Sequence, residues 1–65
     1  MNDKIHERLQ SYVNNANSSE SEDDLELWSE KIGAYCAALR DCGYLTVSES
    51  VGLAFRYRLR IRYKY

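Results

Sequence analysis

The sequence of 65 residues contains no proline, one histidine and two cysteines, and these shortages exclude several classes of site. His6 is the only histidine, and Cys36 and Cys42 do not form a Cys-x-x-Cys motif, so no metal-ligand set is present. No apolar run approaches the roughly 18 residues that a membrane-spanning helix needs. We therefore expect no metal, no cofactor and no membrane insertion.

The residues that catalysis requires are also poorly represented. General acid–base catalysis needs titratable groups that converge in a dry pocket, whereas the acidic residues cluster over positions 20–26, in a polar segment and a helix start. Cys36 lies on an apolar helical stripe and is expected to be a small core residue. The sequence therefore predicts a protein that is not an enzyme.

The short length also predicts association. Domains below about 70–80 residues usually need a disulfide, a metal or another subunit for stability. The N-terminus lacks the apolar region of a secretory signal, so we expect a cytoplasmic location, where structural disulfides are rare. We predict a single small domain over residues 1–65 that forms a homodimer or higher oligomer, or a complex with a larger protein.

Charge is divided sharply along the chain, although the net charge is only −1. Residues 1–50 hold ten acidic and four basic residues, and residues 51–65 hold five basic residues and no acidic one. The two ends could pair head to tail in an oligomer, or offer one charged end to another partner.

The first half of the chain predicts two helices with a linker between them. Residues 3–13 carry apolar positions at helical spacing, and residues 14–21 form a flexible polar linker with little to bury. Residues 22–42 follow Ser21, a good N-cap, and begin with acidic residues that suit the helix dipole. They end before Gly43, which suits a left-handed C-terminal cap. This long helix carries a continuous apolar stripe on which Trp28 is expected to be a core residue. Its opposite side has small residues that allow close approach of another helix: Gly33, Ala34, Ala37 and Ala38.

Residues 55–65 alternate between apolar or aromatic and basic residues, so two structures remain open. Such alternation is typical of a strand, and residues 53–65 could pair with residues 44–48 in a β-hairpin and give an α+β fold. Against this, Thr46 and Glu49 form a capping box that predicts a helix start. We favour an all-α fold, with a helix over 47–64 packed on the helix 22–42 as an antiparallel hairpin. As a helix, this segment has two apolar stripes, 55/59/63 and 57/61/65, of which one can close the hairpin and the other needs another chain.

Residues 34–49, Ala-Tyr-Cys-Ala-Ala-Leu-Arg-Asp-Cys-Gly-Tyr-Leu-Thr-Val-Ser-Glu, resemble a helical hairpin of small phage and prophage proteins. In that pattern a long helix stops at a glycine, turns over two apolar residues and restarts at a capping box. The resemblance covers about a quarter of the chain and transfers no active-site residue. It implies a mobile-element origin and an accessory role, as in antirepressors and host-takeover factors that bind a larger protein.

Tyrosine and arginine are enriched at protein interfaces, so the C-terminal segment is the predicted partner-binding site. We expect a regulatory protein that binds a larger protein stoichiometrically, for example a transcriptional repressor. The alternative is a small nucleic-acid-binding protein whose basic and aromatic residues contact phosphates and stack on bases, although the chain as a whole is slightly acidic. The candidate partner-binding residues are Phe55, Arg56, Tyr57, Arg58, Arg60, Ile61, Arg62, Tyr63 and Tyr65.

Overall fold

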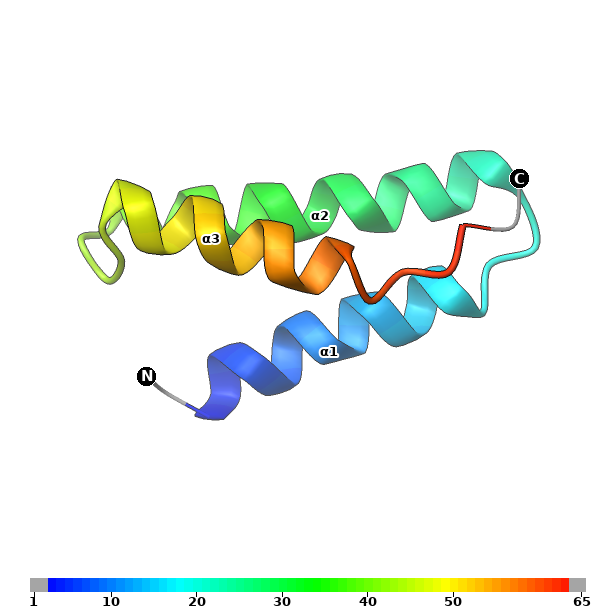
Figure 1. Cartoon of the computed structure of the whole chain (residues 1–65), viewed down its shortest axis with the longest axis horizontal. Coiled ribbons are helices and arrows are strands. Elements are labelled where there is room, and N and C mark those ends of the chain that lie inside the picture. Colours follow the sequence, from blue (N-terminus) through cyan, green and yellow to red (C-terminus); the bar gives the residue numbers. More distant parts are fainter. Residues whose placement is uncertain (1–2, 64–65) are drawn as a thin grey trace.

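The computed structural model describes residues 3–63, which form three helices: α1 (Asp3–Asn17), α2 (Glu22–Asp41) and α3 (Val47–Arg58). α2 and α3 lie side by side, and α1 packs beneath them (Figure 1). The described residues contain no strand, which confirms the all-helical class. The alternative β-hairpin of residues 44–48 and 53–65 is therefore wrong wherever the structure describes those segments.

α1 is longer than the sequence predicted, because it continues past residue 13 to Asn17. Ile5, Leu9, Val13 and Ala16 are all buried, so the apolar stripe extends one further turn through a residue that the sequence had placed in the linker. The predicted linker of residues 14–21 is thereby reduced to the four residues 18–21.

α2 begins and ends where its capping residues predict. The Ser21 side chain accepts a hydrogen bond from the Asp24 backbone N–H (3.2 Å), as an N-cap does. At the other end Gly43 has a φ of +79°, in the left-handed region that favours glycine. The backbone N–H of Tyr44 returns to the Leu39 carbonyl (2.9 Å) and closes the helix end.

α3 begins at the predicted capping box but ends at Arg58, six residues before the predicted end. Beyond it, Asn17 binds the chain from the side: its Oδ1 accepts the Arg62 backbone N–H (2.7 Å), and its Nδ2 donates to the Arg60 carbonyl (3.4 Å). These long-range hydrogen bonds satisfy backbone groups that a further helical turn would otherwise use. Ile61, in the segment that Asn17 holds, is buried in the core.

One apolar core joins the three helices. Its centre is formed by Leu9 and Ile32, which have no exposed surface, and by Val13 and Cys36, which are 1% exposed. Trp28 is only partly buried at the edge of this core, where its ring lies 5.8 Å from that of Tyr12. The expectation that Trp28 occupies the core itself is therefore corrected. The remaining core residues are Ile5, Ala16, Leu25, Leu45, Leu53, Ala54, Tyr57 and Ile61.

The capping box of α3 makes stability depend on pH through Glu49. Its Oε1 accepts the Thr46 backbone N–H (3.0 Å), and this hydrogen bond, with a smaller effect of the Thr46 side chain, lowers the pKa of the Glu49 carboxyl below its ordinary value. The Thr46 hydroxyl accepts the Glu49 backbone N–H (3.1 Å) and completes the box. A carboxyl whose pKa is lower in the folded state stabilises that state above its unfolded pKa, and the contribution disappears as pH falls through the folded pKa. We expect wild type to lose more stability than Glu49→Gln between neutral pH and pH of about 3, measured by urea unfolding. An identical pH dependence in both proteins would contradict this role.

Candidate protein-binding surface

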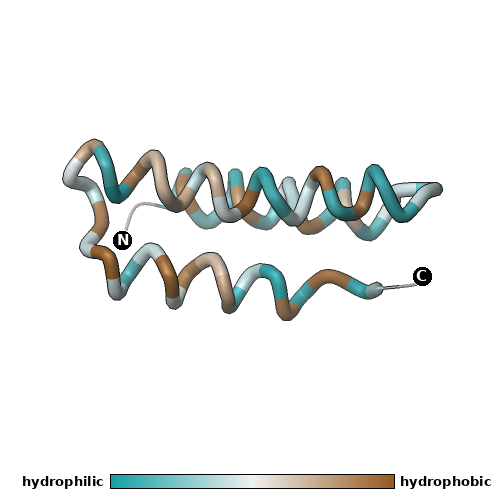
Figure 2. Tube along the Cα trace, turned by 90° about the horizontal axis from the view of Figure 1, so that it is seen from above, coloured by the Kyte–Doolittle hydropathy of each residue, from teal (hydrophilic) through white to brown (hydrophobic). Residues whose placement is uncertain are grey.

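Four large apolar side chains lie exposed in a row along α3. Val47, Val51, Phe55 and Leu59 are between 62% and 69% exposed. Each step of four residues turns only about 40° around a helix, so the four follow one outward side of α3 and its C-terminal cap. We call these four residues the α3 ridge. Figure 2 shows α3 alone along one edge of the molecule, with apolar positions recurring on it.

The inward side of α3 is apolar as well, and it completes the chain's own core. Leu53, Ala54 and Tyr57 are buried there, and the Tyr57 hydroxyl lies 2.5 Å from Nδ1 of His6 on α1. Of the two stripes that the sequence indicated, Tyr57 and Ile61 are inside the fold, whereas Phe55, Leu59 and Tyr63 are outside. Tyr57 and Ile61 therefore offer no surface to a partner while the chain stays folded in this way.

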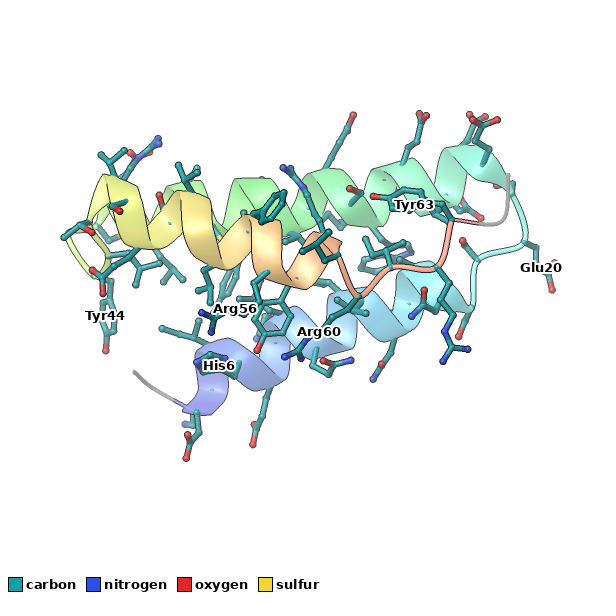
Figure 3. The ribbon with its side chains drawn as sticks, in the orientation of Figure 1. His6, Glu20, Tyr44, Arg56, Arg60 and Tyr63 are labelled. Atoms are coloured by element: carbon teal, nitrogen blue, oxygen red, sulfur yellow. The ribbon has the colours of Figure 1, made fainter. Side chains whose placement is uncertain are left out.

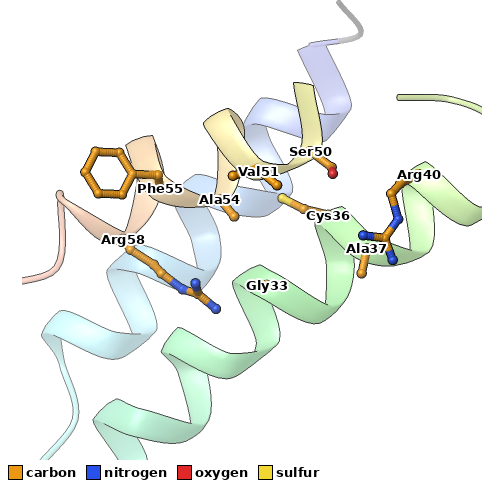
Figure 4. Close-up of a pocket in the computed structure, with 9 residues that line it drawn as sticks. All are labelled: Gly33, Cys36, Ala37, Arg40, Ser50, Val51, Ala54, Phe55 and Arg58. Atoms are coloured by element: carbon orange, nitrogen blue, oxygen red, sulfur yellow. The ribbon is translucent and has the colours of Figure 1, made fainter. Parts of the chain in front are cut away.

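A shallow groove of about 280 Å³ lies beside the ridge, between α2 and α3 (Figure 4). Cys36 lies in its wall, and burial raises the pKa of the thiol, an effect that the nearby Arg58 charge opposes. A buried thiol with a raised pKa is a poor nucleophile, so the groove is suited to packing rather than to cysteine chemistry. The groove is lined by Gly33, Cys36, Ala37, Arg40, Ser50, Val51, Ala54, Phe55 and Arg58.

Arg58 is held by its own chain across this groove. Its Nε donates to the Ser29 carbonyl (3.3 Å), and its guanidinium lies over Gly33, where an added side-chain carbon would clash with it. Figure 4 shows the arginine reaching from α3 toward α2. Gly33 was predicted to allow close approach of another helix, and in the structure it makes room for the Arg58 side chain.

This arrangement predicts that Gly33→Ala is stabilising. Alanine is favoured over glycine in a helix by about 1 kcal/mol, and the atom that it meets is the mobile end of Arg58. The displaced contact is one exposed hydrogen bond of small net value. We expect the free energy of unfolding to rise by about 0.5 kcal/mol, measured by urea denaturation. A loss of more than about 1 kcal/mol would show that Arg58 cannot move aside.

Arg60 is also engaged within the chain. Its Nη1 donates to Oε1 of Gln10 (2.6 Å), and its guanidinium lies 4.5 Å from the centre of the Tyr57 ring, a cation–π distance. In Figure 3 it lies over α1. Arg58 and Arg60 therefore attach the C-terminal segment to α2 and α1, which is a structural role that the alternating sequence did not reveal.

The remaining predicted site residues are more accessible. The side chains of Arg56 and Arg62 are exposed and have no hydrogen bond or ion pair to any described residue, and Tyr63 is 61% exposed. Tyr65 lies outside the described residues. The exposed side chains of the predicted site that the chain itself does not hold are thus Phe55, Arg56, Arg62 and Tyr63. They are joined by three ridge residues that the prediction had not included: Val47, Val51 and Leu59. Their spacing at every fourth position is visible in the sequence and is typical of a helix, but spacing alone does not show whether such a row is buried or exposed.

The acidic segment at positions 20–26 does not neutralise these arginines. Glu20, Glu22, Asp23, Asp24 and Glu26 are exposed around the start of α2, and none forms an ion pair with a described basic residue. The acidic segment and the side chains of Arg56 and Arg62 are therefore all available to an outside partner.

The chain has no match among protein-family models, curated proteins or solved structures. Within residues 3–63, no three of the histidine, cysteine and acidic side chains are grouped as a metal ion would require. None of the three helices combines the length and the apolar character needed to cross a membrane.

Proposed function

We propose that this protein is a non-catalytic regulator that binds a larger protein stoichiometrically through the α3 ridge and the adjoining Arg56, Arg62 and Tyr63. The observation that carries the proposal is the ridge itself: four large apolar side chains, each more than 60% exposed, on a helix whose other side is already in the core. Contiguous exposed apolar surface is typical of interaction sites. Aromatic and arginine residues at its edge are those that interfaces concentrate.

The proposal includes self-association, with α2 and α3 acting as an antiparallel hairpin that presents the ridge. A second copy would cover the ridge in the free protein, and a target would replace that copy. The C-terminal segment would then contribute Arg62 and Tyr63 at the edge of either interface.

The class of target that we propose is a DNA-binding repressor in the cytoplasm, as for an antirepressor. Two features support this class. The turn and capping box at residues 43–49 belong to the segment that resembles phage and prophage hairpins. The exposed acidic segment at 20–26 could oppose the basic surface with which a repressor contacts DNA. Such binding would block or redirect the repressor without any chemical step.

Capture of a target, followed by reconstitution, tests the proposal. Wild type would be immobilised, and a protein that it retains would be purified and titrated back against wild type and Phe55→Gln in parallel. We expect a complex of fixed stoichiometry by light scattering, release of the target from its DNA, and weak dependence of affinity on salt. A complex that forms equally well with Phe55→Gln would exclude the ridge as the binding surface.

Nucleic-acid binding is the alternative outcome of the same salt titration. It is favoured by the exposed Arg56, Arg62 and Tyr63, and disfavoured because Arg58 and Arg60 already bind α2 and α1. Neutralisation of several phosphates would make affinity fall steeply with salt. Steep salt dependence with an oligonucleotide, in the absence of any protein target, would replace the proposed function with this one.

A further inference from the structure

The flank of the α3 ridge carries one negative and one positive residue in a specific arrangement. Glu49 and Arg56 are seven positions apart, which places them within about 20° of each other around the helix and about 10 Å apart along it. Both line the hollow between α3 and His6 of α1. They form no ion pair with each other, and Arg56 has no partner among the described residues. In Figure 3 Arg56 lies on the side of α3 that faces α1.

We propose that the α3 ridge pairs with the ridge of a second copy, with the two α3 helices antiparallel about a two-fold axis near residue 53. This inference rests on the self-association in the proposed function and specifies its geometry. In this register Val51 lies opposite Phe55 of the partner subunit, and Val47 lies opposite Leu59 of the partner subunit. A two-fold axis repeats each contact, so all four ridge residues are covered on both copies.

Charge selects the antiparallel direction. When two antiparallel helices pair about a two-fold axis, each flank meets the same flank of the other copy. Glu49 and Arg56 of the partner subunit then lie at nearly the same height along the helix axis, offset by one residue or about 1.5 Å. The two-fold symmetry produces a second identical pair. A parallel pairing would instead place Arg56 beside Arg58 of the partner subunit, and like charges repel.

The surface between the ridge and this charged flank leaves room for a second helix. Ser48 and Gly52 lie there, both exposed, and a side-chain carbon built on Gly52 would meet no atom within 4 Å. In the proposed register Phe55 of the partner subunit packs beside Gly52, where the helix backbone is uncovered. The Glu49 carboxylate has a second oxygen for the partner while Oε1 holds the capping box.

The interface is small, so the dimer should dissociate on dilution. A standard stable interface buries roughly 800 Å² on each partner, close to a fifth of the 4483 Å² surface of this chain. A single pair of three-turn helices covers less than that. We therefore expect an equilibrium between monomer and dimer in the micromolar range, measurable by analytical ultracentrifugation.

The experiment compares four proteins over the same concentration range. Arg56→Glu replaces both attractive pairs with repulsive ones and should weaken association by about tenfold. Arg8→Glu makes the same charge change at an exposed position of α1 and should leave association unchanged. Arg56→Glu combined with Glu49→Gln keeps a side chain that can complete the capping box and removes the repulsion, so association should recover in part. Urea unfolding of each variant confirms that all four are folded.

Two results would overturn the inference, and they are distinguishable. If Arg56→Glu associates as tightly as wild type, the copies pair by another surface or direction, and the proposed function stands. If wild type stays monomeric to the highest concentration reached, self-association itself is wrong, and the capture experiment decides separately whether the ridge binds a target.

Discussion

Leu9→Ala is expected to remove a large share of the free energy of unfolding, so that the variant unfolds at a much lower urea concentration than wild type. Leu9 is completely buried at the centre of the core, where α1 meets the other helices. Truncation of a buried leucine to alanine costs about 2–5 kcal/mol. A domain of this size has a total stability of about 3–10 kcal/mol, so the loss is a large share of what is available. Far-ultraviolet circular dichroism and urea unfolding measure it directly.

Trp28→Ala provides the comparison that makes this prediction specific. Trp28 is larger than Leu9, and the sequence alone would make it the more damaging site, with a loss of about 3–5 kcal/mol. Trp28 lies at the edge of the core against Tyr12, with Lys31 5.2 Å from its ring centre. We therefore expect Trp28→Ala to lose less free energy of unfolding than Leu9→Ala. A Leu9→Ala protein that unfolds at a higher urea concentration than Trp28→Ala would contradict the packing described here.

Phe55→Gln is expected to weaken self-association at least about a hundredfold without unfolding the chain. Truncation of a central interface residue costs about 2 kcal/mol or more, and a two-fold interface loses it twice, which corresponds to roughly a thousandfold. Phe55 is 64% exposed in the monomer, and glutamine is a good helix former, so stability should change by less than about 0.5 kcal/mol. Analytical ultracentrifugation measures the strength of self-association, and urea unfolding measures the stability of the chain.

Leu27→Gln is the matched control for this prediction. Leu27 is a large apolar residue that is 48% exposed on α2, outside the ridge. Its replacement should therefore alter neither self-association nor stability appreciably. Equal losses of association in both variants would indicate nonspecific apolar contact rather than a defined interface. Tyr57→Ala could not serve here, because Tyr57 is buried and its loss would affect folding.

The sequence predicted the helices where the local signals were strong. The Ser21 cap, the glycine at position 43 and the Thr46–Glu49 capping box each occur in the structure as expected. These signals act between residues close in sequence, so they can be recognised without knowledge of the fold. The end of α1 was missed because Ala16 is small and lies among polar residues, and its burial depends on packing against other helices.

The C-terminal segment was harder to predict because its structure depends on distant contacts. Asn17 binds backbone groups more than 40 positions away and Gln10 binds Arg60, while Gly33 accommodates the Arg58 side chain. No local pattern in residues 55–65 indicates these partners. The sequence therefore showed that the segment has two apolar stripes, but not which stripe would be buried or which arginines the fold would use.

The most direct test of the central claim is to map the self-contact surface by nuclear magnetic resonance. Spectra of the ¹⁵N-labelled protein would be recorded from millimolar to low micromolar concentration, and the amide shifts compared residue by residue. We predict concentration-dependent shifts confined to α3 around Val47, Val51, Phe55 and Leu59, with α1 and the exposed side of α2 unchanged. Shifts centred on α1 or on the exposed side of α2, or no change over the whole range, would contradict the claim that the protein self-associates through the α3 ridge.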